Sequence, residues 1–291
     1  MVLRGFSLIR PLYREKGRVD PTSCTGGRQV ERQVRQSNLP LFLTYRNKTT
    51  NSTGSSSQFP HRLNQRRFYY CMSIHHHTVS LIHHTNKGDE LVAYMARVSN
   101  PANQNNTKTS AKLIKYLIEH HHWSPFEMVN MCVEIETTRS IAAQILRHRS
   151  FSFQEFSQRY ADPTKDLAVF MREARLQDTK NRQNSIETDD NELKNAWYLK
   201  QKQIVHEAEL AYKWAIENGI AKEQARAVLP EGNMQSRMYM KGNVRSWMHY
   251  CELRCGNGTQ KEHREVAHKC ADILVNHLPF LKEWHKELPH A

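Results

Sequence analysis

The residues of this chain that are best suited to chemistry lie in one short segment, which reads RHRSFSFQEFSQRY over positions 147–160. Each guanidinium presents a planar fork of donors that matches phosphate and carbonyl oxygens, and guanidinium groups this close repel one another unless an anion lies between them. Phe151, Phe153 and Phe156 are interleaved with the polar residues, which is rare in a strip that only faces water. The segment therefore favours a site for a flat anionic ligand over a solvated basic surface.

A predicted helix over 140–147 leads into this segment. Gln144, Arg147 and His148 are spaced i, i+3 and i+4, so on a continuous helix they share one face. The helix would then bring an amide, a guanidinium and an imidazole to one opening. Taken alone, such a stripe is more typical of a solvated helix face.

The residues from 150 to 160 place polar side chains at alternate positions. An extended backbone there would turn Glu155, Ser157 and Arg159 to one side, which we expect to face the opening at the end of the preceding helix. The combined set suits a nucleotide, because arginines bind phosphate and an amide pairs with a base edge.

A second polar face is expected on a helix over 244–253. Arg245, His249 and Glu252 share that face, while the apolar residues between them point to the core. Asn243 is the expected N-cap, and Arg254 ends the helix, where a cation also complements the helix dipole.

Strands and helices follow one another along the chain after residue 71. Predicted strands cover 78–82, 128–137 and 234–241; predicted helices cover 89–97, 111–121, 190–217, 223–228 and 262–281, with a loop at 101–106 and a turn at 242–243. Strands separated by helices, some linked as hairpins, predict a mixed α/β or α+β fold, in which a central sheet has flanking helices.

Charge is distributed unevenly along the 291 residues, whose formal net charge is +13. Residues 1–70 hold 13 Lys and Arg against 3 Asp and Glu, and the rest of the chain holds 29 against 26. The rival interpretation, a nucleic-acid-binding protein, is therefore disfavoured, because a net charge of +3 in the folded part is too small an excess to form a phosphate-binding stripe.

Residues 1–71 form a basic, low-complexity leader, which we expect to be disordered, and residues 72–291 form the predicted folded domain. Two other interpretations of the leader stay open. Its Arg- and Ser-rich, acid-poor composition also resembles an organelle transit peptide, and Met72 is an alternative native start.

Several classes of protein are disfavoured by what the sequence lacks. It has no uncharged apolar run of about 18 residues, which a membrane span needs, and no glycine-rich dinucleotide or phosphate loop. The six cysteines form no C-x-x-C pair, and His120-His121-His122 lacks the spacing of metal ligands. We expect reduced core cysteines, no metal and a cytoplasmic protein, with organelle targeting by the leader left open.

Arg147-His148-Arg149, seven residues and then Ser157 resemble the signature of flavin-dependent thymidylate synthases. Similar motifs occur in the same order along the chain: Ala96-Arg97-Val98-Ser99, His122-x-x-Pro125-Phe126-Glu127, Gln144, Arg226-Ala227-Val228-Leu229-Pro230, and Asn243-x-Arg245 with His249 and Arg254. The resemblance covers about residues 72–279. It implies the fold of that family, a homotetramer and the reductive methylation of dUMP to dTMP, with methylenetetrahydrofolate as carbon donor, FAD as redox carrier and NADPH as reductant.

The resemblance also implies two sets of ligand-binding residues. The FAD set is Ser99, His122, Ser124, Arg147, His148, Arg149, Glu155, Asn243, Arg245 and His249. The dUMP set is Gln144, Arg147, Glu155, Ser157, Gln158, Arg159, Arg226 and Arg254.

Two residues of the dUMP set are predicted to be catalytic. Arg254 beside N3 and O2 of uracil would favour the ionised ring, whose C5 attacks the one-carbon unit. Ser157 would orient the nucleotide, because a hydroxyl without a paired base is a weak nucleophile. The remaining alternative is a pseudoenzyme with this fold, which would not bind flavin.

Overall fold

The computed structural model describes residues 76–289 of the chain, which belong to one compact unit, Arg66–Ala291. The expected leader over 1–71, with Cys24 and Cys71, and the alternative start at Met72 lie outside the described residues.

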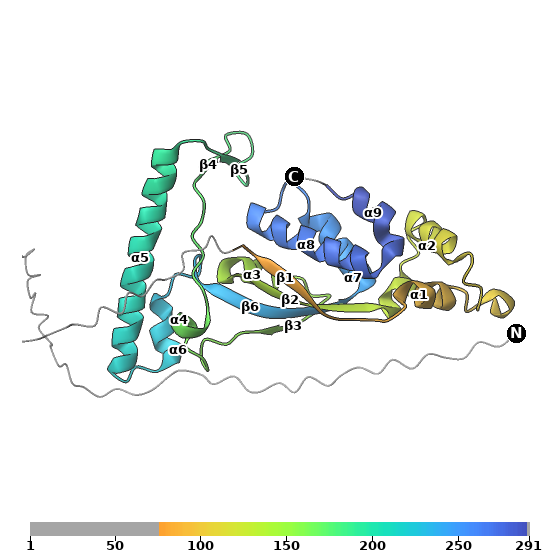
Figure 1. Ribbon diagram of the computed structural model, residues 1–291, viewed down its shortest axis with the longest axis horizontal. Helices are drawn as coiled ribbons and strands as arrows, with labels where there is room; N and C mark the ends of the chain where they lie inside the picture. The colour runs from red at the N-terminus through yellow and green to blue at the C-terminus, as the bar shows by residue number, and fades with distance from the viewer. Residues whose placement is uncertain (1–75, 290–291) are drawn as a thin grey trace, which may run out of the picture. The chain divides into compact units, whose positions relative to one another are not determined.

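An antiparallel sheet with the strand order β1-β2-β6-β3 forms the centre of this unit (Figure 1). Its strands are β1 (Thr78–His84), β2 (Asn130–Thr138), β3 (Ser152–Glu155) and β6 (Gln235–Asn243). Side chains alternate between the two faces of β2 and β6, so that Met131, Val133 and Ile135 are buried while Glu134 and Glu136 face outward. The expected mixed fold with a central sheet and flanking helices is confirmed.

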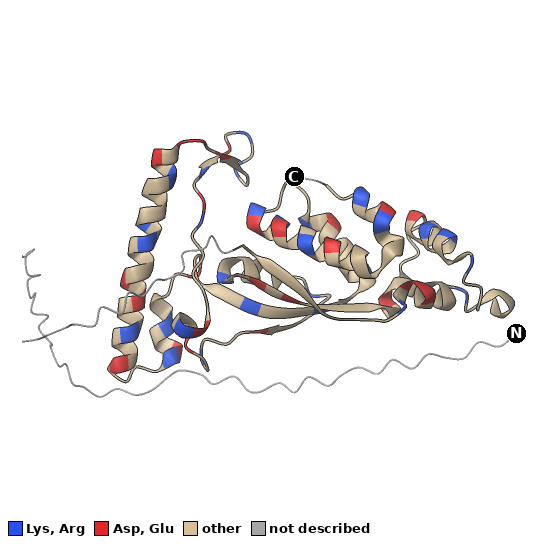
Figure 2. Ribbon diagram, in the orientation of Figure 1, with Lys and Arg blue, Asp and Glu red and all other residues tan. Residues whose placement is uncertain are grey.

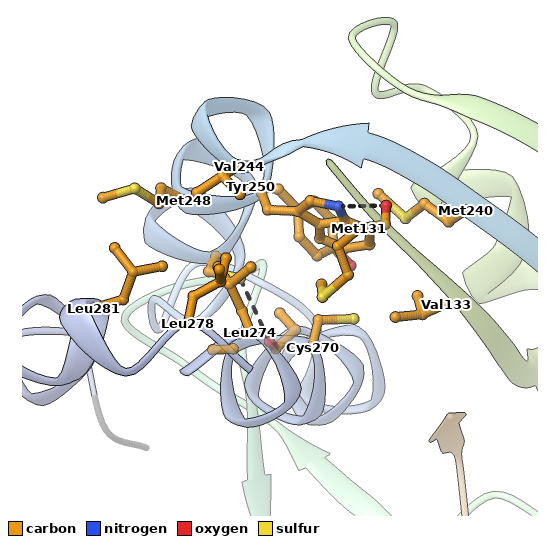
Figure 3. Close-up of a cluster of buried hydrophobic side chains, with 14 of the residues drawn as sticks. Met131, Val133, Met240, Val244, Met248, Tyr250, Cys270, Leu274, Leu278 and Leu281 are labelled. Carbon is orange, nitrogen blue, oxygen red and sulfur yellow. Dashed lines mark hydrogen bonds between the residues drawn. The ribbon is translucent and has the colours of Figure 1, made fainter. Parts of the chain in front are cut away.

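Two helices, α7 (Val244–Arg254) and α8 (Lys261–His277), cover the apolar face of the sheet (Figure 1). Figure 3 shows Met131, Val133 and Met240 of the sheet facing Tyr250 of α7 and Cys270 of α8. The indole N–H of Trp247 donates to the main-chain oxygen of Met131 over 3.1 Å, so the burial of this polar atom carries no penalty.

The cysteines of the described residues are free thiols. Cys251, Cys255 and Cys270 are buried in the core and Cys132 is half-buried on the sheet. Cys251, Cys255 and Cys270 are therefore core residues as expected, whereas Cys132 is not. Burial raises the pKa of the Cys255 thiol to about 12, which keeps it protonated and unreactive.

The other helices frame this core. They are α1 (Gly88–Ala96), α2 (Ser110–Glu119), α3 (Arg139–Ile145), α4 (Pro163–Asp166), α5 (Asn191–Glu217), α6 (Lys222–Ala225) and α9 (Lys282–Lys286), with short 3-10 turns η1 (Pro101–Asn103), η2 (Ser124–Met128), η3 (Arg226–Val228) and η4 (Pro279–Leu281). Acidic and basic residues are mixed along α5 and α8 (Figure 2). No helix among residues 76–289 is long and apolar enough to cross a membrane.

The segment between β3 and α5 contains an element that the sequence pattern did not predict, the hairpin β4 (Arg175–Gln177) with β5 (Ser185–Glu187). Ion pairs join it to the start of α8: Arg175 to Glu262 over 2.7 Å and Lys261 to Glu187 over 2.6 Å. The hairpin therefore fixes the first turn of α8.

Some expectations about local structure are wrong. The helix expected over 262–281 ends at His277, and η4 and α9 follow it. Gly242 and Asn243 were expected to form a turn, but they continue β6 and pair with Met131 and Asn130 of β2. Helix α3 was expected to reach Arg147, but it ends at Ile145. The expected N-cap is confirmed, because Asn243 Oδ1 accepts from the Ser246 amide over 2.8 Å.

Candidate active site

The signature segment leaves α3 in a tight turn. The amide of Arg147 donates to the oxygen of Gln144 over 3.4 Å, and that of His148 to the oxygen of Ile145 over 3.0 Å. These i to i+3 bonds end the helix, so the expected helical face shared by Gln144, Arg147 and His148 does not form. The turn still holds all three residues within one short stretch.

His148 meets Arg254 at the end of α7, where Nε of Arg254 donates to Nε2 of His148 over 2.9 Å. The imidazole also lies edge-on to the ring of Tyr250, with 4.9 Å between ring centroids. Burial, and then the charge of Arg254, lower the pKa of His148 to about 4. A neutral imidazole is the form that accepts from a guanidinium, so the geometry and the pKa agree.

Gln144 is held by two residues from the start of α8 that sequence reasoning missed. Its Nε2 donates to Oε1 of Gln260 over 2.8 Å, and its Oε1 lies 3.2 Å from Nδ1 of His263. His263 is fully buried, and its Nε2 lies 3.1 Å from the hydroxyl of Tyr250. Only the apolar periodicity of α8 was visible in the sequence, and that pattern gives no hint of a polar partner for His263.

A cavity of about 920 Å³ lies beside α7. Arg245 and His249 line it from the shared face of α7 that the sequence predicted, and Ser150 lines it from the signature segment. Its aromatic wall consists of Trp123, Phe280 and Trp284. The cavity has the size and the apolar lining of sites for planar organic ligands.

The charges around this cavity balance, because four carboxylates face four cations: Glu119, Glu252, Glu283 and Glu287, and Lys112, Lys115, Arg245 and Lys282. Anion-binding capacity lies instead in the signature segment. Among residues 76–289, neither Arg147 nor Arg149 has an ion-pair partner, although Arg245 pairs with Glu127 over 3.3 Å. The two arginines without an ion-pair partner therefore suit an anionic group.

Three predicted cofactor residues lie around α2. Ser99 lines an open cavity of about 460 Å³ formed by α1, η1 and α2. The ring of His122 lies 6.0 Å from that of Tyr116, edge to face, and Ser124 is exposed at the start of η2. The larger cavity is lined by the neighbour His121, whose φ of 56° is left-handed and unusual for a residue other than glycine.

Glu155 ends β3 and points toward β6. The hydroxyl of Ser236 donates to Glu155 Oε1 over 2.6 Å, and Arg139 of α3 lies 3.5 Å from the same oxygen. These two partners, one from the sheet and one from a helix, hold the carboxylate in one orientation.

Residues after Glu155 do not continue the expected extended backbone, because the amides of Tyr160 and Ala161 both donate to the oxygen of Ser157 in a turn. Arg159 forms an ion pair with Glu223 of α6 over 3.2 Å. Gln158 is 1% exposed, and its Nε2 has no hydrogen-bond partner among the described residues. An orphaned buried donor of this kind is costly unless a ligand or water accepts from it.

Apart from Ser99, His122 and Ser124 around α2, one chain thus presents many of the predicted residues in three groups. Gln144, His148 and Arg254 lie together between α3 and α7; Arg245 and His249 line the large cavity with Ser150; the turn at 157–159 reaches α6, which runs directly into η3 and Arg226. Arg226 is half-buried and has no ion-pair partner among residues 76–289.

Known proteins that resemble this chain share most of the described region. Residues 80–280 match the family described as "Thymidylate synthase complementing protein". A probable flavin-dependent thymidylate synthase of Paramecium bursaria Chlorella virus 1 is 47% identical over 202 residues, which are 69% of this chain and 92% of the viral protein. A flavin-dependent thymidylate synthase of Synechocystis sp. is 50% identical over 189 residues, 65% of this chain and 85% of that protein.

The fold also resembles a solved structure, the crystal structure of a UMP/dUMP methylase, PolB, from Streptomyces cacaoi bound with 5-Br dUMP. The TM-score is 0.61 at 25% identity, over 73% of this chain and 97% of the other. Every predicted site residue lies between positions 99 and 254, inside the stretch that matches the family.

Proposed function

This chain belongs to the flavin-dependent thymidylate synthase family, and we therefore propose that it is a methyltransferase that converts dUMP to dTMP with the help of a bound flavin. The family match over residues 80–280 and the identities of 47% and 50% to named synthases confirm the resemblance that the motifs indicated. The observation that carries the proposal is that the matched stretch contains every residue of both predicted ligand sets.

The residues around the large cavity fit FAD. Trp123, Phe280 and Trp284 offer flat apolar surface to a planar ring, and the unpaired Arg147 and Arg149 offer charge to a diphosphate. Of the predicted FAD set, Arg245 and His249 would contact the cofactor from the cavity wall, and Arg147 and Arg149 would bind its diphosphate. When bound, FAD supplies the redox chemistry, and the chain supplies placement and electrostatics.

Arg254 is the residue that we propose to act on the uracil. Its Nε is occupied by His148, and within residues 76–289 its two Nη groups have no hydrogen-bond partner. A guanidinium held at one end by a neutral imidazole can present both remaining nitrogens to N3 and O2 of the base. Its charge would then stabilise the ionised ring, in which C5 is electron-rich.

The phosphate and ribose of dUMP are assigned to the turn at 157–159 and to η3. Arg159, Arg226 and Arg147 would neutralise the phosphate, and Ser157 would orient the nucleotide by hydrogen bonding. The unpartnered Nε2 of Gln158 is a buried donor that a ligand oxygen at this turn would satisfy. Glu155, held by Ser236 and Arg139, would accept from a hydroxyl or an amide of either ligand.

Methylenetetrahydrofolate and NADPH are the co-substrates that we propose from the family reaction. The methylene carbon comes from the folate and the hydride comes, through the flavin, from NADPH. No residue of the chain is assigned to either co-substrate.

A homotetramer is the proposed assembly, because one chain leaves its predicted ligand residues in separate groups. The long helix α5 supports this proposal, since it exposes large apolar side chains along much of its length: Leu199, Leu210 and Trp214 are 53%, 48% and 61% exposed. Burying that stripe against another copy of the chain would bring residues of the second copy beside the ligand residues of the first.

The division of the chain at residue 72 and its compartment are also proposals. We propose that residues 72–291 form the catalytic domain, that the leader is dispensable for catalysis, and that the protein works in the cytoplasm. The family match begins at residue 80 and so lies entirely within the proposed domain.

The absorption spectrum of the purified full-length protein tests the proposal. After incubation with FAD and removal of the free cofactor, the protein should retain flavin absorption bands, and these should bleach when NADPH is added. A colourless protein that fails to retain added FAD would overturn the assignment and favour a pseudoenzyme.

A further inference from the structure

We propose that His263, a residue outside both predicted ligand sets, orients the side-chain amide of Gln144 for recognition of the nucleotide. This inference rests on the proposed function, in which Gln144 contacts dUMP. His263 touches neither ligand in this account, and it acts through Gln144 as a positioning residue.

The contacts of His263 form a continuous chain from α7 through α8 to α3. The hydroxyl of Tyr250 lies 3.1 Å from Nε2 of His263, and Nδ1 of His263 lies 3.2 Å from Oε1 of Gln144. Gln144 Nε2 then contacts Gln260 Oε1 over 2.8 Å. Tyr250 and His263 are both fully buried, so water does not compete for the hydrogen bond between them.

The donor and the acceptor of each hydrogen bond in this series are fixed by a carboxylate, which accepts from Gln260 at the end opposite Tyr250. Gln260 Nε2 donates to Oε2 of Glu262 over 2.9 Å, and Arg175 donates to the other oxygen of Glu262 over 2.7 Å. Burial alone would raise the pKa of Glu262, but its own backbone N–H and the charges of Arg172 and Arg175 lower that pKa overall. The carboxylate is therefore ionised and can only accept.

The donor and acceptor roles of the other residues follow, one bond at a time, from the ionised Glu262. Because the side-chain nitrogen of Gln260 donates to Glu262, the side-chain oxygen of Gln260 faces Gln144. That oxygen accepts from the amide nitrogen of Gln144. The oxygen of Gln144 consequently faces His263, which must donate from Nδ1, and Nε2 is left to accept from the hydroxyl of Tyr250. One tautomer of His263 satisfies all of these bonds.

The surroundings of His263 keep its ring neutral, which this tautomer requires. Burial first, and then Arg254 and His148 from the neighbouring elements, lower the pKa of His263 to about 3. A protonated ring would turn Nε2 into a donor and set it against the hydroxyl hydrogen of Tyr250.

The consequence for Gln144 is a fixed orientation with defined spare capacity. After its hydrogen bonds with Gln260 and His263, the Gln144 amide still has one N–H and one lone pair that can bind a ligand. Without the donor on His263, only the bond to Gln260 holds the amide, and ordering the less constrained side chain on ligand binding costs free energy. Loss of His263 should therefore weaken ground-state binding of dUMP more than it slows the chemical steps.

Replacing His263 by Asn or by Leu separates this role from simple packing. The Asn side chain can place an N–H close to the position of Nδ1, whereas Leu fills similar space without a donor. A matched control is His77, a second buried histidine, which contacts Thr137 over 2.8 Å and has no contact with Gln144. His77→Leu removes a buried imidazole elsewhere in the same fold.

The experiment measures KM for dUMP, kcat, flavin content and melting temperature for the FAD-loaded full-length protein and for each variant. His263→Leu should raise KM for dUMP about tenfold, the equivalent of one lost hydrogen bond, with flavin retained and little change in kcat. His263→Asn should restore KM toward the wild-type value, and His77→Leu should lower the melting temperature without raising KM.

Tyr250→Phe is the alternative variant if His263→Leu fails to fold, because it removes only the hydroxyl that fixes the tautomer of His263. It should raise KM for dUMP by a smaller factor. Equal KM values for wild type, His263→Leu and Tyr250→Phe would overturn the inference, and so would an equal rise in the Asn and Leu variants. Failure of the wild-type protein itself to turn over dUMP would instead count against the proposed function.

Discussion

Arg254 donates a hydrogen bond from its Nε to Nε2 of His148 over 2.9 Å, although the two residues lie 106 positions apart in the sequence. Arg254 belongs to the predicted dUMP set and His148 to the predicted FAD set. This single contact therefore couples the groups that would hold the two ligands, and it leaves the two Nη groups of Arg254 for the base.

Arg254→Ala should retain FAD but lose most thymidylate formation. The change removes the charge proposed to stabilise the ionised uracil, and loss of one such electrostatic contact costs about 100-fold or more in turnover. Steady-state kinetics with dUMP, alongside the flavin absorbance of the variant, measures both effects. Unchanged turnover would refute the assigned role, and Arg264→Ala, which loses only a contact with Asn257 over 3.3 Å, is the control.

Stability should fall as the solution becomes mildly acidic. Burial lowers the pKa values of His77 and His148 to about 4 and of His263 to about 3, from an ordinary value of 6.5. Below pH 6.5 the unfolded chain therefore binds protons that the folded chain rejects, so the free energy of unfolding decreases from pH 6.5 down to about 4. Above that range these three groups add no pH dependence.

Urea unfolding at a series of pH values measures this slope. His77→Gln removes one of the three groups and should make the dependence on pH shallower by about one proton. An identical slope in wild type and variant would show that His77 titrates in the same way in the folded and unfolded chains.

Arg245→Ala should reduce the amount of FAD that the protein retains. Arg245 lines the large cavity, and its guanidinium is about half exposed there beside Glu127. Loss of one charged contact to a ligand typically weakens binding by about tenfold. The flavin dissociation constant, obtained from the quenching of flavin fluorescence, measures the change, and wild-type affinity in the variant would place FAD elsewhere.

Gly242→Ala should destabilise the fold and disturb the signature segment. A Cβ at this strand position would overlap the ring of Phe151, which lies within that segment. Overpacking of this kind costs about 1–3 kcal/mol. Denaturant unfolding measures the loss, and Gly258→Ala is the matched control, because a Cβ there meets nothing within 4 Å.

The double substitution Leu210→Glu with Trp214→Glu should dissociate the proposed homotetramer. It places two charges on the exposed apolar stripe of α5, where burial against another copy would leave them unpaired. Light scattering during gel filtration measures the mass. Lys213→Ala on the same helix alters only an exposed ion pair with Glu217 and should leave the mass unchanged.

Periodicity and capping signals were sufficient to locate the main elements. The long helix α5 has the N-cap Asp190 and ends before Gly219, whose φ of 77° suits glycine. The shared face of Arg245 and His249 followed in the same way from the spacing of apolar residues on α7. Such features are local, so one segment of sequence is enough to predict them.

Features that depend on distant residues were not predictable. Gly242-Asn243 has the composition of a turn, but Gly242 is required inside β6 by the ring of Phe151 packed against it. The strands of the hairpin β4–β5 are short, and their apolar residues Leu176 and Ile186 are each 48% exposed, so no periodic signal marks them. The role of His263 depends on partners from α3 and α7, which only the folded chain brings together.

The formation of dTMP by the purified full-length protein tests the central claim most directly. The protein would be loaded with FAD and given NADPH, dUMP and methylenetetrahydrofolate labelled in its methylene carbon. The nucleotides would then be separated and their masses measured by mass spectrometry. Labelled dTMP should form, and omission of FAD or of NADPH should abolish it. A flavin-loaded protein that leaves dUMP unchanged with all components present would contradict the account.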